Sequence, residues 1–128
     1  MKTTIIAAIV AAFIATPAIA ERPTIDEHTK CVVVHQVYDE TPEDEMDLYM
    51  VNRIAIFVKQ TLAEADGVHI LKGQKSILTP LDENGESAVI AYVTVGCAQH
   101  LNQTLRKWAL EAYENLRASQ VAMGIVKK

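Results

Sequence analysis

The segment AVIAYVTVGCAQHLNQTLRKWALEAYENLRASQVAM, residues 88–123, decides the fold of this 128-residue chain. Its first part is an apolar run that ends near Cys97. Its second part repeats apolar side chains at steps of three and four, which is typical of an amphipathic helix. A short polar turn separates the two parts. We therefore predict one helix over residues 86–99 and a second that starts after Asn102 and ends at Gly124.

The same spacing predicts which side chains of these two helices face a core. On the helix over 86–99 the inward residues are Val89, Val93, Gly96 and Cys97. On the last helix they are Leu105, Trp108, Ala109, Ala112, Leu116 and Ser119. Charged residues lie off this second face, and they include Arg106, Lys107, Glu111, Glu114 and Arg117. Trp108 is therefore interpreted as a core residue and not as a platform for a ligand.

Two further helices are predicted upstream. Thr24 has capping-box spacing to Glu27 and would start a helix that runs to about Tyr38. The β-branched residues 32–34 could instead form a strand, but we favour the helix. The next helix runs from Pro42 to Asp66 and has a wide apolar face. Its stripe is Leu48, Val51, Ala55, Val58, Leu62 and Ala65, with Met50, Ile54 and Phe57 beside it and Gly67 as a C-terminal cap.

Residues 67–87 form an irregular insert with several turn-forming residues. Residues 68–71 and 76–78 could pair as a small hairpin. The alternative is an irregular connection in which a turn of helix starts at Pro80. We interpret Asn84-Gly85 as part of a loop. The sequence therefore predicts a small all-α, four-helix domain with an irregular insert around 67–87.

The first 20 residues are typical of a cleavable signal peptide. A lysine precedes an apolar run over residues 5–15, and Ala18-Ile19-Ala20 is a small-x-small cleavage signal. The run is too short for a membrane anchor, which needs about 20 apolar residues. We predict export to the periplasm and a single mature domain over residues 21–128.

The charge of the chain restricts its partners. The formal net charge is −4 at pH 7, and no cluster of basic residues stands out. Nucleic acid and anionic membranes are therefore poor partners, which leaves proteins. No nucleophile elbow, phosphate-binding loop, dinucleotide fingerprint or H-E-x-x-H motif occurs, so we predict no enzyme activity and no cofactor.

Cys31 and Cys97 are the two cysteines of the chain. An even number of cysteines in an exported protein is most simply one disulfide. The alternative is a zinc site, because His35 lies four positions after Cys31 and His100 lies three positions after Cys97. The loose spacing and the oxidising compartment favour the disulfide, which would also leave no thiolate for catalysis. The other two histidines, His28 and His69, are expected to be exposed.

Residues 39–47, DETPEDEMD, are densely acidic. Thr41 and Pro42 suit the start of a helix, where the helix dipole favours carboxylates. A calcium site is the alternative, but no EF-hand spacing is present, so we predict no metal here. The cluster consists of Asp39, Glu40, Glu43, Asp44, Glu45 and Asp47.

The layout resembles the HdeA/HdeB family of small periplasmic helical proteins, which are acid-stress chaperones and relatives of unassigned role. The likeness covers residues 31–128 and is greatest in VGCAQHLNQTLRKWALEAYENLR around Cys97. The resemblance implies a disulfide-tied domain, often a homodimer at neutral pH, that acid loosens so that exposed apolar surface shields unfolded clients. The acidic cluster would be the pH-sensitive element. The alternative is a dedicated protein-binding partner, such as an immunity or inhibitor protein, with no chaperone activity.

Overall fold

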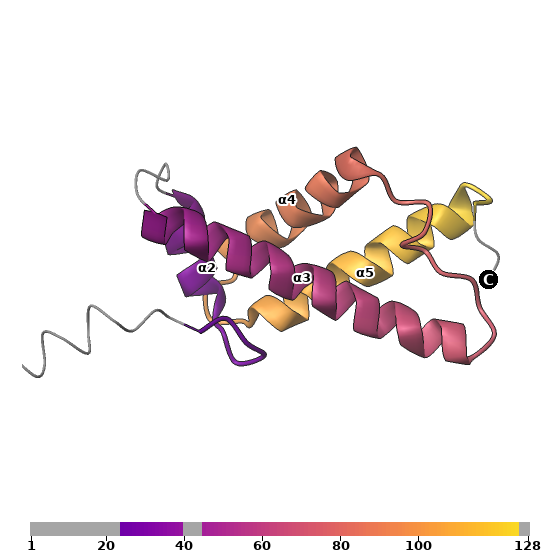
Figure 1. Ribbon diagram of the computed structural model, residues 1–128, viewed down its shortest axis with the longest axis horizontal. Coiled ribbons are helices and arrows are strands. Elements are labelled where there is room, and N and C mark those ends of the chain that lie inside the picture. The colour runs from indigo at the N-terminus through magenta and orange to yellow at the C-terminus, as the bar shows by residue number, and fades with distance from the viewer. Residues whose placement is uncertain (1–23, 40–44, 126–128) are drawn as a thin grey trace, which may run out of the picture.

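The computed structural model describes residues 24–39 and 45–125, and these residues form four α-helices with no strand (Figure 1). The helices are α2 (Cys31–Asp39), α3 (Glu45–Leu71), α4 (Glu83–Gln99) and α5 (Leu105–Ala122). The predicted all-α, four-helix domain is therefore confirmed. No hairpin forms between α3 and α4, where the chain is an irregular connection. The predicted signal peptide lies outside the described residues.

The four helices enclose one core. α4 packs against α2 and α5, and the long helix α3 packs against α5 and α2. The fully buried side chains come from all four helices and from the connection between α3 and α4. The largest of them are Tyr113, Ile54, Ile77, Leu105, Val34, Val58, Val93, Thr61, Cys31 and Cys97.

A disulfide joins the first residue of α2 to the end of α4. The Cα atoms of Cys31 and Cys97 are 4.7 Å apart, and both side chains are fully buried. Backbone hydrogen bonds reinforce this end of the molecule. The Cys31 N–H donates to the carbonyl of Gln103 at 2.8 Å, and the Leu105 N–H donates to the carbonyl of Thr29 at 2.9 Å. The predicted disulfide is confirmed, and we call this region the disulfide end.

The first and last helices start later than the sequence predicts. α2 begins at Cys31 and not at Thr24, because residues 24–30 form a turn in which the Asp26 carboxylate accepts the His28 N–H at 2.8 Å. α5 is capped by Thr104 and not by Asn102. The hydroxyl of Thr104 accepts the Lys107 N–H at 3.2 Å, which satisfies a backbone donor that the first turn leaves free.

The boundaries around the insert also differ from the prediction. α3 continues through Gly67 to Leu71, and Gly73 follows with a φ of +85°, a conformation that glycine adopts readily. Asn84-Gly85 lies in the first turn of α4, because the Asp82 carboxylate caps that helix by accepting the Gly85 N–H at 2.8 Å. The predicted loop at Asn84-Gly85 is therefore wrong, and the insert shrinks to residues 72–82.

The predicted inner face is confirmed for α4 and partly wrong for the other two long helices. All four residues expected to face inward from α4 are buried. On α3 the buried stripe is rotated from the prediction, and Leu48 is 59% exposed. That stripe is Met50, Ile54, Val58 and Leu62. On α5 Ser119 is exposed, whereas Tyr113, Arg117 and Gln120 are buried. These shifts place polar side chains inside the bundle.

Candidate functional site

A buried carboxylate holds together the end of the bundle that lies away from the disulfide. Asp66 of α3 is only 3% exposed. It accepts hydrogen bonds from the Ser76 hydroxyl at 2.5 Å, the Ile77 N–H at 3.0 Å and the Tyr113 hydroxyl at 3.0 Å. One side chain thus ties α3, the connection over 72–82 and α5 to each other. We call this region the distal end.

These hydrogen bonds decide the protonation of Asp66. Burial alone raises the pKa of a carboxyl group, because it disfavours the charged form. In Asp66 this effect is outweighed by the bonds from Ser76, Ile77 and Tyr113, together with the nearby His69, so that the pKa lies below its usual value of 3.8. Asp66 is therefore a charged carboxylate at neutral pH, and hydrogen bonds from the protein replace its contacts with water.

Other polar side chains surround Asp66. The His69 ring stacks on Tyr113 with centroids 5.5 Å apart, and its Nδ1 bonds to the Gln74 side chain. Burial, followed by the bond to Asp66, raises the pKa of Tyr113 to about 12. The Gln120 amide donates to the Ile77 carbonyl at 2.8 Å, so α5 holds the connection at a second point.

This network was not predicted from the sequence. Asp66 follows Leu62 by four residues and so continues the stripe of Ile54, Val58 and Leu62 along α3. Tyr113 follows the buried Ala109 of α5 at the same spacing. A polar residue at a core position of an amphipathic helix was therefore the available signal, since such groups need a hydrogen-bonding partner.

The histidines do not share a metal site with the cysteines. Cys31 and Cys97 are bonded to each other, and within residues 24–39 and 45–125 no three His, Cys, Asp or Glu residues could hold a metal ion. His28 is exposed as predicted and lies 3.4 Å from Glu27. His69 is half-buried against Tyr113, so the prediction that it is exposed is wrong.

Only part of the predicted acidic cluster lies in the described residues. Asp39 is exposed at the end of α2, and Glu45 and Asp47 belong to the first turn of α3. Glu40, Glu43 and Asp44 lie outside the described residues. The pH-sensitive role of this cluster stays a prediction.

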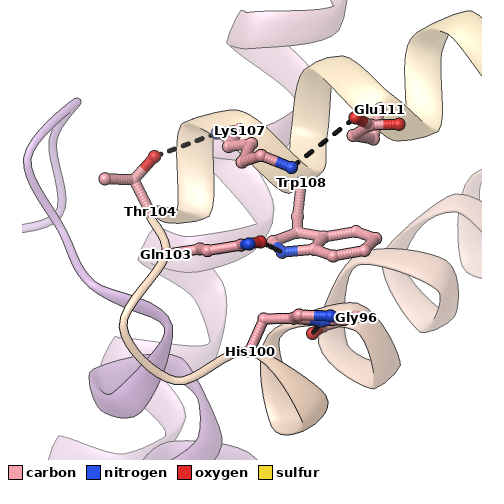
Figure 2. Close-up of polar contacts among 7 residues, drawn as sticks. All are labelled: Gly96, His100, Gln103, Thr104, Lys107, Trp108 and Glu111. Atoms are coloured by element: carbon pink, nitrogen blue, oxygen red, sulfur yellow. Dashed lines mark hydrogen bonds and ion pairs between the residues drawn. The ribbon is translucent and has the colours of Figure 1, made fainter.

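A second feature is the surroundings of Trp108 at the disulfide end (Figure 2). The indole N–H donates to the Gln103 side chain at 2.8 Å, and the His100 ring stacks on the indole with centroids 4.9 Å apart. Lys107 Nζ lies 5.2 Å from the centre of the indole. Gly96 of α4 lies so close to this ring that a Cβ there would overlap it. Trp108 is half-buried and packs against the core, so the prediction that it is a core residue is partly right.

The exposed side of Trp108 borders an open groove between α4 and α5 with a volume of about 490 Å³. Its lining is mostly apolar and carries no charged side chain. The lining residues are Ala88, Ala91, Tyr92, Val95, Gly96, Gln99 and Trp108. The groove therefore suits contact with an uncharged, apolar surface.

Comparison with known proteins adds no family to this description. No family model, no curated protein and no solved structure matches the chain. Among the described helices, none combines the length and apolarity required to cross a bilayer. The distal network, the disulfide and the exposed apolar side chains are the features of the described residues that bear on function.

Proposed function

We propose that this chain is an exported, non-enzymatic chaperone that binds unfolded protein clients in acid, as members of the HdeA/HdeB family do. The observation that carries the proposal is the buried carboxylate of Asp66. This one side chain lies on α3 and accepts hydrogen bonds from the connection over 72–82 and from α5. Acid neutralises such a group, whereas it leaves a disulfide intact. The two ends of the bundle are therefore expected to respond differently to acid.

Protonation of Asp66 would loosen the distal end in a defined pH range. A group whose pKa is lower in the folded state than in the unfolded chain stabilises the fold above its unfolded pKa. This stabilisation is lost as the pH falls from 3.8, the usual pKa of the group, through the lower pKa that Asp66 has in the folded protein. The connection over 72–82 would then be held less firmly over the core.

Loosening would enlarge an apolar surface that already exists. Ile77 of the connection is fully buried and would become accessible. Several apolar side chains of the distal end are exposed even before this loosening, and each adds to the apolar surface that a client could contact. They are Val68, Ile70, Leu71, Met123 and Ile125. The disulfide would keep the opened chain tied at its other end.

Charge supports the proposal as well. The chain has 12 Lys and Arg residues and 4 His residues against 16 acids. When acid neutralises the carboxylates, the chain becomes strongly positive, which opposes its own aggregation while apolar surface is exposed. The signal-peptide pattern over residues 1–20 supports export to the periplasm, a compartment that permits disulfides.

The test is suppression of aggregation of an acid-denatured enzyme such as citrate synthase. The pure mature protein should suppress light scattering between about pH 2 and about pH 4, where carboxylates take up protons. Asp66→Asn imitates the protonated side chain, so this variant should begin to suppress aggregation at a higher pH than the wild type. Failure of the wild type throughout this range would reject the proposal.

Asp82→Asn is the matched control for this variant. Asp82 is an exposed helix cap, and asparagine caps helices as well as aspartate does. Its onset of activity should equal that of the wild type. If both variants shifted the onset equally, net charge and not the Asp66 network would set the pH of activation.

A further inference from the structure

Asp66 and Arg117 are the two buried charged residues in the part of the chain that the structure describes, and both lie at the distal end. Arg117 of α5 is only 8% exposed, and its Nη1 atom has no hydrogen-bond partner among the described residues. The ion pairs that the structure shows in residues 24–39 and 45–125 do not include Arg117. A guanidinium keeps its positive charge at every pH at which proteins fold, so inside the protein it needs a negative charge nearby.

The hydroxyl of Tyr113 couples the two buried charges. It donates to the Asp66 carboxylate at 3.0 Å. Burial and this bond raise the pKa of Tyr113, whereas a hydrogen bond and the charge of the nearby Arg117 guanidinium lower it. A hydroxyl that donates to a carboxylate becomes a better acceptor, because hydrogen bonds in a chain polarise one another. The negative charge of Asp66 therefore acts on Arg117 through Tyr113.

His69 brings a third charge to the same tyrosine in acid. Its ring stacks on Tyr113 with centroids 5.5 Å apart, and its charge interacts with that of Asp66. Histidine side chains in general gain a positive charge as the pH falls through about 6.5. At neutral pH the negative charge of Asp66 balances that of Arg117. When acid protonates Asp66 and His69, two positive charges remain around Tyr113 and their negative partner is lost.

The other charged side chains around this end do not replace Asp66 in acid. On α4, Glu86 lies 3.4 Å from Lys59, a residue of α3. Further charged side chains of the connection, α4 and α5 are exposed, namely Lys72, Lys75, Asp82, Glu83 and Glu114. Exposed carboxylates take up protons in the range in which carboxyl groups generally titrate, near pH 4. Acid thus removes the negative charge at the surface of this end as well as inside it.

We propose that Arg117 drives the opening of the distal end in acid: with Asp66 neutral, its buried charge is left uncompensated beside the charged His69 and moves into water, which lifts the connection over 72–82 off the core. A neutral carboxyl group still accepts hydrogen bonds, so protonation by itself need not break every bond to Asp66. A buried cation without a negative partner is far more costly. As a mechanism of activation this role of Arg117 rests on the proposed chaperone function, whereas the opening itself involves no client.

Hydrogen exchange of residues 72–82, measured by mass spectrometry against pH and corrected for the intrinsic exchange rate, reports the opening without a client. In the wild type, exchange should increase as the pH falls below 3.8. Arg117→Met keeps an unbranched side chain but removes the charge, so the midpoint of opening should fall by about one pH unit. Arg117→Lys is also charged in acid and should open close to the wild-type midpoint.

Arg106→Met is the matched control. Arg106 lies on the same helix, and its guanidinium is 3.5 Å from Glu64 at the surface, so this substitution changes the net charge equally but outside the core. Its midpoint should equal that of the wild type. A second test variant is His69→Phe, which keeps a ring on Tyr113 without the charge that acid adds. It should also lower the midpoint.

Several outcomes would overturn the proposal. They are a wild type whose exchange over residues 72–82 does not change in acid, equal midpoints in the wild type and Arg117→Met, and equal shifts in the two methionine variants. If Arg117→Met does not fold at neutral pH, an unchanged midpoint in His69→Phe would overturn it instead. If the connection opens as expected but the wild type does not suppress aggregation, the chaperone function fails and the role of Arg117 in the opening stands.

Discussion

At the disulfide end, a covalent bond between α2 and α4 and a set of backbone hydrogen bonds join the segments, and none of these bonds involves a group that takes up a proton in acid. At the distal end, three segments meet on the carboxylate of Asp66. Two buried polar atoms nearby, Arg117 Nη1 and Gln120 Oε1, have no hydrogen-bond partner among the described residues. One small bundle thus combines an end held by a disulfide and backbone hydrogen bonds with an end held by a carboxylate.

Removing the disulfide should have the largest effect on stability. The bond closes a loop with a sequence separation of 66 residues, and in the chain-entropy description such a loop contributes about 4 kcal/mol. Cys31→Ala combined with Cys97→Ala should lower the free energy of unfolding in urea by about this amount. The reduced wild type should show the same loss. A difference below about 1 kcal/mol would mean that backbone contacts, and not the disulfide, hold this end together.

Removing the carboxylate should have the next largest effect. Asp66→Ala deprives the Ser76 hydroxyl, the Ile77 N–H and the Tyr113 hydroxyl of their acceptor inside the protein. Hydrogen bonds to a charged group contribute about 1.5–3 kcal/mol each, and partial rearrangement should leave a net loss of about 3 kcal/mol. Asp82→Ala, which removes an exposed helix cap, should cost about 1 kcal/mol. Equal losses in the two variants would show that Asp66 does not hold the distal end.

The pH dependence of unfolding also distinguishes the distal end from the disulfide end. The pKa of Asp66 is lower in the folded protein than its usual value of 3.8, so the folded state prefers the deprotonated form. The free energy of unfolding of the wild type should therefore fall as the pH drops below 3.8, with the disulfide still closed. Asp66→Asn should be less stable at neutral pH and should lose less between neutral pH and acid. If the free energy of unfolding fell equally with pH in the wild type and in Asp66→Asn, other carboxylates would be responsible for the acid response.

The two ends also differ in how far the sequence predicts them. The disulfide was predicted from an even number of cysteines together with a signal-peptide pattern, and the inner face of α4 was predicted from the spacing of Val89, Val93 and Cys97. The distal network does not follow, because Tyr113 is 47 residues from Asp66 in sequence. Periodicity finds the faces of helices, but it does not pair polar groups that meet only after the helices pack.

The end of α3 and the start of α4 differ from the prediction for a related reason. Gly67 and the Asn84-Gly85 pair are residues that usually end helices or form turns. At Gly67 the helix continues because the next turn carries His69, which stacks on Tyr113. At Gly85 the backbone N–H donates a hydrogen bond to the Asp82 carboxylate, which caps the start of α4. Local preference, of about 1 kcal/mol for a glycine, is smaller than such contacts together.

Packing around the single tryptophan offers a test of the disulfide end. A Cβ at Gly96 would overlap the indole of Trp108, which stacks between His100 and α4. Gly96→Ala should therefore displace the ring and cost about 2 kcal/mol, as overpacked cores do. The fluorescence of Trp108 should change together with the unfolding midpoint. An unchanged spectrum at unchanged stability would show that this end is less tightly packed than the structure indicates.

The same substitution at the distal end should have the smallest effect and the opposite sign. Gly67 lies inside α3, and a Cβ there would have no atom within 4 Å. Alanine restricts the unfolded chain more than glycine does, so Gly67→Ala should raise the free energy of unfolding by about 0.5–1 kcal/mol. Because both glycines lie inside helices, close to the C-terminal ends of α3 and α4, helix preference alone would give both variants the same sign. If Gly67→Ala raises the free energy of unfolding and Gly96→Ala lowers it, packing and not helix preference decides the outcome at Gly96. If both substitutions raise it, the disulfide end is not more tightly packed at Gly96 than the distal end is at Gly67.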